Sequence, residues 1–240
     1  TTEIYTLSLH DALPISYPND AGTGEWGGDV SYPFAVSIDP RGMTFLWPGT
    51  DGQGRCVVRL DREGRTLWRF TPFFDAGGNI HTLASDGDFV YLTYETPTSP
   101  PAVLRLSAAK GEPQFFVKDA KSVPLPLSVE TKRMETLDIS RPVNFDLIAT
   151  GLAVDVQYLY VSIFPSNEIL VLNKADASLL KRIPVPGPRG LAIEKDGVLL
   201  AASYAGKSGR VCRITVDSGD CRDVVTSGLD APWGVAMRSN

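Results

Sequence analysis

The sequence predicts an all-β protein, and three observations indicate this fold class. Short runs of apolar, β-branched and aromatic residues follow one another from Pro33 onward. Turn-forming Gly, Asp, Asn and Pro interrupt these runs about every eight to twelve residues, which is typical of sheet proteins. Apolar residues do not recur there with the period of a helix. We therefore expect short antiparallel strands joined by tight turns.

One sequence motif recurs along the chain and indicates a structural repeat. Its clearest copies are Gly151–Asp155, Gly190–Glu194 and Gly234–Met237. Each complete copy begins a unit of four expected strands, because a second apolar run and then another hairpin follow it. Units of about 40–50 residues with four antiparallel strands are typical of β-propeller blades. The predicted fold is therefore a β-propeller fragment of about four blades plus the first strand of a fifth.

The expected strands follow the same plan in every unit. The first strand carries the repeated motif and ends at a turn rich in Asp and Gly, and the second is a short run rich in apolar and aromatic residues. The third and fourth form a hairpin, as in Cys56–Asp61 with Thr66–Phe70 and in Arg210–Thr215 with Cys221–Val225. The blades are expected at about residues 33–72, 79–119, 148–187 and 188–230, with the start of the next at 231–240.

Two further segments interrupt this plan. Residues 120–147 form an insertion, and its prolines argue against a regular central strand, which leaves an extra hairpin and a long loop as alternatives. Residues 1–15 match the translation of a common sequencing-library adapter without a mismatch. Such added segments are excluded from fold reasoning. We therefore expect the natural sequence to start near Ser16, residues 16–32 to form an irregular lead-in loop, and both natural ends to be missing.

The motif in Pro188–Gly197, repeated in Pro232–Met237, resembles the repeat of NHL-type and related six-bladed β-propeller proteins. These include TolB-like and lactonase-like members, and the resemblance covers residues 33–240. It implies the propeller fold and a bacterial type of protein, and it is unspecific for function.

Charge and hydropathy exclude two classes of partner. The formal net charge is −5, and leaving out residues 1–15 removes two of the 28 acidic residues and none of the 23 basic ones. A mildly acidic chain lacks the basic face that a nucleic acid requires. No apolar run approaches the ~20 residues of a membrane helix. The compartment stays open, with an extracytoplasmic location favoured.

The three cysteines are Cys56, Cys212 and Cys221. A turn at Ser218–Gly219 would set the last two four residues apart along the ladder, roughly 13 Å at the rise of a strand. A disulfide requires Cα atoms within about 7 Å. We therefore expect free, buried thiols.

Six residues are predicted to line a binding site at the mouth of the central channel. Four are aromatic residues at the ends of second strands, and two lie where a first strand begins. They are Trp47, Tyr94, Phe164, Arg189, Tyr204 and Trp233. Aromatic rings with a few polar groups suit peptide or carbohydrate ligands. The alternative is that these rings pack between adjacent blades. Asp86 and Asp155, in contrast, are predicted to serve as turn residues.

Catalysis has little support in the sequence, so a non-catalytic binding module without a cofactor is favoured. Beyond residues 1–15, His81 is the sole histidine and has no neighbouring partner for a nucleophile–base pair. The alternative is a metal-dependent hydrolase, because the resemblance to propeller lactonases implies a divalent cation such as calcium. Only Asn79 has a suitable ligand side chain at the corresponding strand starts.

Overall fold

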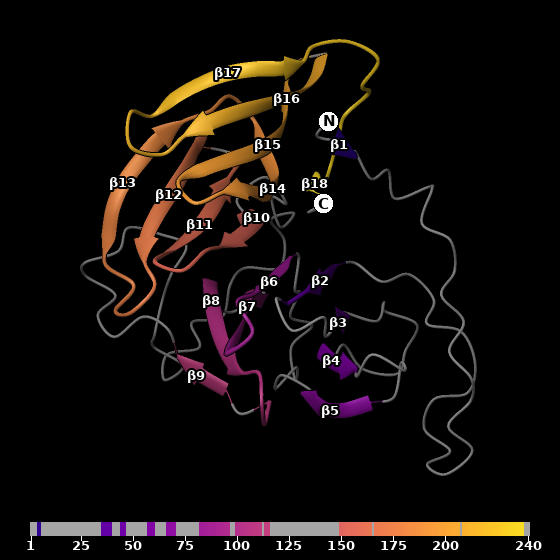
Figure 1. The fold of residues 1–240 in the computed structure, drawn as a ribbon, viewed down its shortest axis with the longest axis vertical. Helices are drawn as coiled ribbons and strands as arrows, with labels where there is room; N and C mark the ends of the chain where they lie inside the picture. The colour runs from indigo at the N-terminus through magenta and orange to yellow at the C-terminus, as the bar shows by residue number, and fades with distance from the viewer. Residues whose placement is uncertain are drawn as a thin grey trace.

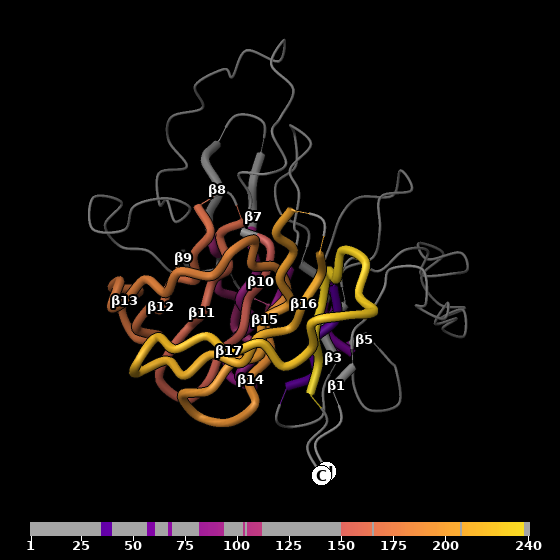
Figure 2. Tube along the Cα trace, turned by 90° about the horizontal axis from the view of Figure 1, so that it is seen from above, coloured from indigo at the N-terminus to yellow at the C-terminus, as the bar shows by residue number. Residues whose placement is uncertain are grey.

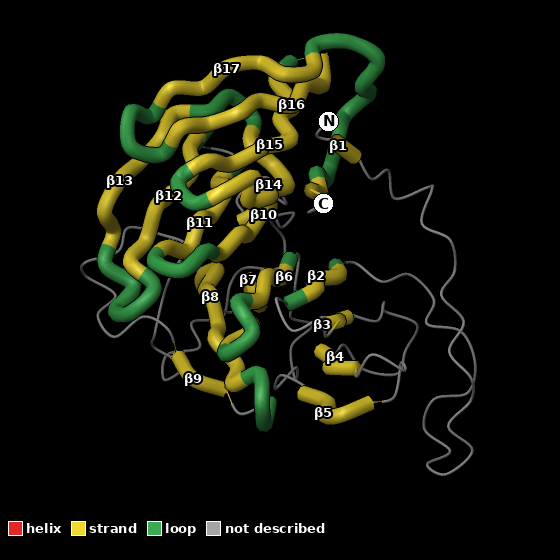
Figure 3. The backbone as a smooth tube through the Cα atoms, viewed as in Figure 1, coloured by secondary structure: helices red, strands yellow, loops and turns green. Residues whose placement is uncertain are grey.

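The computed structural model describes residues 4–5, 35–39, 44–46, 57–60, 66–70, 82–96, 99–111, 113–115, 149–164, 166–206 and 208–237. Every regular element in these ranges is a β-strand, and Figure 3 shows loops and strands but no helix among them. The predicted all-β class is confirmed.

The strands form four antiparallel sheets of four strands, and each sheet follows the order of the chain. Sheet 1 contains β2 (Val36–Ile38), β3 (Thr44–Leu46), β4 (Val57–Leu60) and β5 (Thr66–Phe70). Sheet 2 contains β6 (Leu83–Ser85), β7 (Phe89–Thr96), β8 (Ser99–Ser107) and β9 (Pro113–Phe115). Sheet 3 contains β10 (Ala149–Val154), β11 (Tyr158–Ile163), β12 (Glu168–Asn173) and β13 (Leu179–Pro184). Sheet 4 contains β14 (Pro188–Lys195), β15 (Val198–Ala205), β16 (Ser208–Thr215) and β17 (Asp220–Val225).

The four sheets surround a central axis, with the first strand of each sheet innermost and the fourth outermost (Figure 1). In Figure 2, turned by 90°, sheet 4 is seen from its outer side with β17 in front. A further pair, β1 (Ile4–Tyr5) with β18 (Ala236–Met237), is antiparallel, and β18 lies beside β14. The adapter interpretation of residues 1–15 stays a prediction.

A meander of this kind has two ends. We call the end with the turns between first and second strands and between third and fourth strands the turn face. The opposite end, with the connections between second and third strands and between sheets, is the loop face.

The hydrophobic core lies between neighbouring sheets. One buried cluster joins Tyr91 of sheet 2 to Leu159 and Leu170 of sheet 3. The next joins Tyr160 of sheet 3 to Ile214 of sheet 4. Successive residues of β11 thus pack against opposite neighbours, since successive side chains of a strand point to opposite faces. This two-sided burial explains why the second strands are rich in apolar and aromatic residues.

The glycine of the repeated motif is required because the inner strands approach each other closely. A Cβ atom at Gly190 would lie 2.6 Å from the Cα atom of Gly234 and 2.8 Å from the carbonyl oxygen of Trp233. A Cβ atom at Gly151 would overlap the carbonyl oxygen of Arg189. The glycine therefore recurs because each inner strand lies so close to the next that a side chain at this position would clash with the neighbouring backbone.

The predicted turn roles of Asp86 and Asp155 are confirmed. Oδ1 of Asp155 accepts hydrogen bonds from the backbone N–H groups of Gln157 at 2.8 Å and Tyr158 at 2.7 Å. Its Oδ2 accepts a hydrogen bond from the Tyr160 hydroxyl at 2.6 Å. Asp86 repeats this pattern one sheet earlier. Burial and then the hydrogen bond to Asp155 raise the pKa of Tyr160, so its hydroxyl stays a donor.

The predicted register of the β16–β17 hairpin is wrong. Thr215 pairs with Asp220, whereas the predicted turn at Ser218–Gly219 would pair Asp217 with Asp220. The turn contains four residues because Gly219 adopts a φ of 76°, and its N–H group donates to the carbonyl oxygen of Thr215 at 2.8 Å. Glycine occupies this left-handed conformation without steric cost.

The corrected register brings two cysteines nearer than expected. Cys221 lies opposite Ile214, which is two residues from Cys212, so the offset along the ladder is two residues rather than four. Both thiols are free, as predicted, but only Cys212 is buried and Cys221 is exposed.

Candidate binding site

Four of the six predicted binding residues meet around one guanidinium group. The Cζ atom of Arg189 lies 4.4 Å from the centre of the Trp233 ring. It lies 5.1 Å from the ring centre of Phe164 and 5.1 Å from that of Tyr204. All three distances fall within the ~6 Å over which an aromatic face attracts a cation. We call these four residues the arginine–aromatic cluster.

The members of the cluster come from neighbouring repeats. Phe164 directly follows β11 of sheet 3, whereas Arg189 and Tyr204 lie on β14 and β15 of sheet 4. Trp233 lies in the segment that leads into β18. These positions place the cluster on the loop face. Arg189 lies on β14, the innermost strand of sheet 4 (Figure 1), and Trp233 leads into β18 beside it, so two members of the cluster belong to the inner part of the fold.

Backbone hydrogen bonds hold these elements in place. The N–H group of Gly190 donates to the carbonyl oxygen of Trp233 at 2.9 Å, and that of Tyr204 donates to Gly187 at 2.8 Å. Asn167 ties the loop after Phe164 to the same point, since its Oδ1 accepts a hydrogen bond from the N–H group of Gly187 at 2.7 Å. The geometry of the cluster is thus fixed by main-chain contacts between adjacent repeats.

Asn167 was not predicted as a site residue from the sequence. Its backbone adopts a φ of 54°, a left-handed conformation that asparagine tolerates better than most residues. The Ser–Asn pair after Pro165 is a turn signal that could have located it.

The cluster is neither fully buried nor fully open. Trp233 retains 42% of its surface exposed, and Phe164, Arg189 and Tyr204 are half-buried. The rings therefore pack between adjacent repeats, as one alternative predicts, and they also leave the face of the cluster accessible from the Trp233 side.

The other predicted site residues are described less fully or not at all. Trp47, Asn79 and His81 lie outside the described residues. Tyr94 lies in β7, and only its backbone is described. Their roles stay predictions.

A metal site finds no support in the part of the chain that the structure describes. There, no group of three or more His, Cys, Asp or Glu side chains is placed to hold a cation. The carboxylates of Asp86 and Asp155 already accept hydrogen bonds in their turns. Asn79, the predicted ligand, lies outside the described residues, so the divalent cation that the lactonase resemblance implies stays a prediction. They also contain no helix long and apolar enough to cross a membrane.

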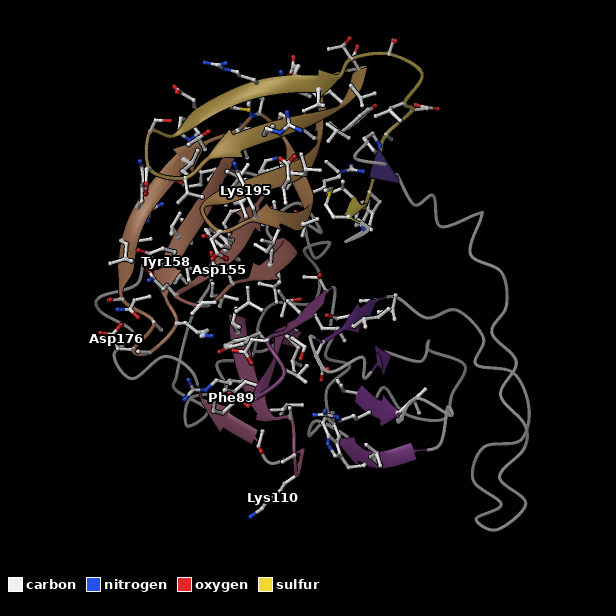
Figure 4. The ribbon with its side chains drawn as sticks, viewed as in Figure 1. Phe89, Lys110, Asp155, Tyr158, Asp176 and Lys195 are labelled. Atoms are coloured by element: carbon white, nitrogen blue, oxygen red, sulfur yellow. The ribbon has the colours of Figure 1, made fainter. Side chains whose placement is uncertain are left out.

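A hollow that was not predicted from the sequence lies on the turn face, between sheets 2 and 3. It is a cavity of about 510 Å³, and its walls include Phe89, Arg105, Tyr158 and Lys174. Figure 4 shows Phe89 on sheet 2 and Tyr158 on sheet 3, on the two sides of this junction. The sequence pattern that could have indicated this cavity is a repeated spacing. In both sheets an Asp is followed by an aromatic residue three positions later and by a Tyr five positions later.

Charged groups of this cavity are engaged with one another or with an aromatic ring. Nζ of Lys174 lies 3.0 Å from Oδ2 of Asp86 and donates a hydrogen bond to the carbonyl oxygen of Asp155 at 3.1 Å. The Cζ atom of Arg105 lies 4.4 Å from the centre of the Phe89 ring. Lys174 thus links sheet 3 to sheet 2, which is a structural role.

Comparison with protein families finds no matching family, and comparison with curated proteins finds no match. Solved structures do resemble the chain. A chain in the nidogen/laminin complex has a TM-score of 0.58 at 15% identity, over 86% of this chain and 68% of that one. XC5397, a gluconolactonase from Xanthomonas campestris, has a TM-score of 0.56 at 19% identity, over 86% and 67%.

TolB from Acinetobacter baumannii has a TM-score of 0.56 at 10% identity, over 84% of this chain and 45% of its own. This chain therefore spans less than half of TolB and about two thirds of the other two structures. At such identities the likeness concerns the fold alone. Together with the four radially arranged sheets, it shows that the chain has the β-propeller fold.

Proposed function

We propose that the protein is a non-catalytic binding module, which presents the arginine–aromatic cluster to a peptide or carbohydrate ligand. The observation that supports this proposal is the convergence of three aromatic rings from adjacent repeats on the guanidinium group of Arg189.

The chemistry of the cluster suits such a ligand. The Trp233 ring offers an accessible apolar face for the C–H groups of a sugar or for an apolar side chain. A guanidinium group carries five N–H donors, which can bind carbonyl or hydroxyl oxygens. Stacking against the rings restricts the arginine, so that less rotamer entropy is lost when a ligand binds.

The position of the cluster also favours binding. Loops on a rigid scaffold commonly carry functional sites, and here the scaffold consists of closely packed inner strands. The nidogen/laminin complex is an example in which a chain of similar fold occurs with a protein partner. The gluconolactonase is an enzyme of similar fold, so the fold does not decide between these functions.

The test uses arrays of immobilised peptides and oligosaccharides, probed with the protein and with two variants. Trp233→Ala removes the accessible ring, and we expect it to weaken retention by a retained probe about 30-fold or more, as for a central aromatic contact. Val156→Ala is the matched control, because Val156 is 75% exposed and lies on the turn face.

Equal retention of Trp233→Ala and the unchanged protein, at the same melting temperature, would contradict the proposal. Loss of retention in Val156→Ala, with retention by Trp233→Ala unchanged, would point to the turn face instead. The hydrolase alternative depends on Asn79, outside the described residues. Lactone hydrolysis that stops on chelation and in Asn79→Ala would favour it.

A further inference from the structure

Cys212 and Cys221 occupy the same side of sheet 4. Ile214 pairs directly with Cys221, and paired residues of a ladder point to the same face. Cys212 precedes Ile214 by two positions, so its side chain also points to that face. The two cysteines are therefore diagonal neighbours on adjacent strands. Sγ of Cys212 donates a hydrogen bond to the carbonyl oxygen of Ala201, on the other neighbouring strand, at 3.7 Å.

The strand that carries Cys221 is able to move toward Cys212. Among the described strands, β17 pairs only with β16, so it forms the outer edge of sheet 4. The register shifts beside Cys212, since Cys212 pairs with Asp223 and Val211 with Val225. The extra residue is Val224, on the side of Cys212 away from Cys221, so the ladder between the two cysteines is regular. Diagonal residues of a ladder lie about 7–8 Å apart, just beyond the ~7 Å between the Cα atoms of a disulfide, so a small displacement of this edge strand brings the sulfur atoms to bonding distance.

The two thiols differ in the way that redox chemistry requires. Cys212 is buried in the core, whereas Cys221 is exposed. The neighbouring thiol of Cys212, assisted by the charge of Arg210, lowers the pKa of Cys221 to about 7 from an ordinary value of 9.0. The neighbouring thiol of Cys221 and burial raise the pKa of Cys212. An accessible thiolate beside a second cysteine is the arrangement of a redox-reactive pair.

We propose that Cys212 and Cys221 are a site of reversible disulfide formation, oxidised by a small-molecule disulfide of the glutathione type. Cys221 is the attacking residue and Cys212 the resolving residue. This inference is independent of the proposed ligand-binding function.

The reaction proceeds by two exchanges. The Cys221 thiolate attacks one sulfur atom of the small disulfide, whose S–S bond breaks, and one half leaves as a thiolate that takes up a proton. The Cys212 thiol then releases its proton to solvent and attacks Sγ of Cys221, which displaces the second half as another thiolate. Two protein thiols are oxidised, and one small disulfide is reduced to two thiols.

The bond would join the outer strand covalently to β16. The bond would keep β17 from separating from β16 at the edge of sheet 4. It would also close a short loop in the unfolded chain and so lower the conformational entropy of the unfolded state. We expect a melting temperature that is a few degrees higher in the oxidised protein and returns on reduction.

The test is incubation with oxidised glutathione, acid quenching and intact-mass measurement. The Cys56→Ser variant serves as the background, so that the third cysteine cannot react. The expected result is a loss of about 2 Da, the mass of two hydrogen atoms, with a crosslinked Cys212–Cys221 peptide on non-reducing digestion. The rate should rise with pH about a midpoint near 7, because the Cys221 thiolate is the nucleophile.

Two matched variants assign the roles. In the same background, Cys212→Ser should stop at a glutathione adduct on Cys221, and Cys221→Ser should remain unmodified because Cys212 is buried. A stable adduct on the protein that keeps both cysteines would overturn the proposal, because Cys212 would then have failed to resolve it. An unmodified mass after prolonged incubation, with the circular dichroism spectrum unchanged, would overturn it as well.

Discussion

The two faces of the propeller use their polar residues in different ways. On the turn face, Asp86 and Asp155 accept backbone hydrogen bonds, and Lys174 joins one sheet to the next. On the loop face, Arg189 lies among aromatic rings, one of which, Trp233, is partly exposed. The comparison shows that a recurring polar residue does not by itself indicate a site. The repeated aspartates are explained by turns, whereas the cluster combines packing between adjacent repeats with a Trp233 ring that keeps 42% of its surface exposed.

The largest effect is expected on the turn face, from Asp39→Ala. Oδ2 of Asp39 lies 3.1 Å from Nη2 of Arg59, and the two side chains are 0% and 7% exposed. Nη1 of Arg59 also donates a hydrogen bond to the carbonyl oxygen of Ala108 in sheet 2. The variant leaves a buried guanidinium without its carboxylate, which should lower the free energy of unfolding by about 3–5 kcal/mol.

Urea denaturation measures this loss. Asp217→Ala is the control, because Asp217 is an exposed residue of the β16–β17 turn, and it should change stability by no more than about 0.5 kcal/mol. Equal losses in the two variants would mean that burial of the Asp39–Arg59 pair does not distinguish it from a surface charge.

The next effect is expected near the loop face, from Gly190→Ala. The added Cβ atom would meet the Gly234 Cα atom at 2.6 Å, so the inner strands have to separate. Overpacking of this kind costs about 1–3 kcal/mol. Gly234→Ala is the matched control, since a Cβ atom there meets no atom within 4 Å. Thermal denaturation of both variants tests this expectation, and a lower melting temperature for Gly234→Ala than for Gly190→Ala would contradict it.

The smallest effect is expected from Lys174→Met, on the turn face. The side chains of Lys174 and Asp86 are 24% and 9% exposed, so solvent screens part of their attraction. We expect a loss of about 1 kcal/mol or less, which shrinks as salt is added. Denaturation at low and high ionic strength measures it. Ligand retention should not change, and a loss of retention would move the binding site to the turn face.

Much of the fold could be predicted because it depends on short-range signals. The strand β12 and the hairpin β4–β5 follow from apolar runs between turn residues, and the repeated glycine marks the inner strands. The β16–β17 register could not be predicted, because the backbone conformation of Gly219 decides how many residues the turn contains. The same sequence is compatible with a turn of two residues and with a turn of four.

The candidate site was predictable in part for the same reason. Four residues of the site were predicted together because they lie at the ends of second strands or the starts of first strands in the repeat. They are Phe164, Arg189, Tyr204 and Trp233. Asn167 and the cavity beside Tyr158 were missed, because their importance depends on residues of a neighbouring unit.

The sequence by itself determined the class of fold, the four-stranded repeat and the positions at which aromatic residues recur, since period, turn chemistry and glycine placement are local properties. Only the tertiary structure decided that three rings from adjacent repeats face one guanidinium group, and that Cys212 and Cys221 are neighbours. The first depends on how closely the inner strands of successive sheets pack, and the second depends on the backbone conformation of a single turn.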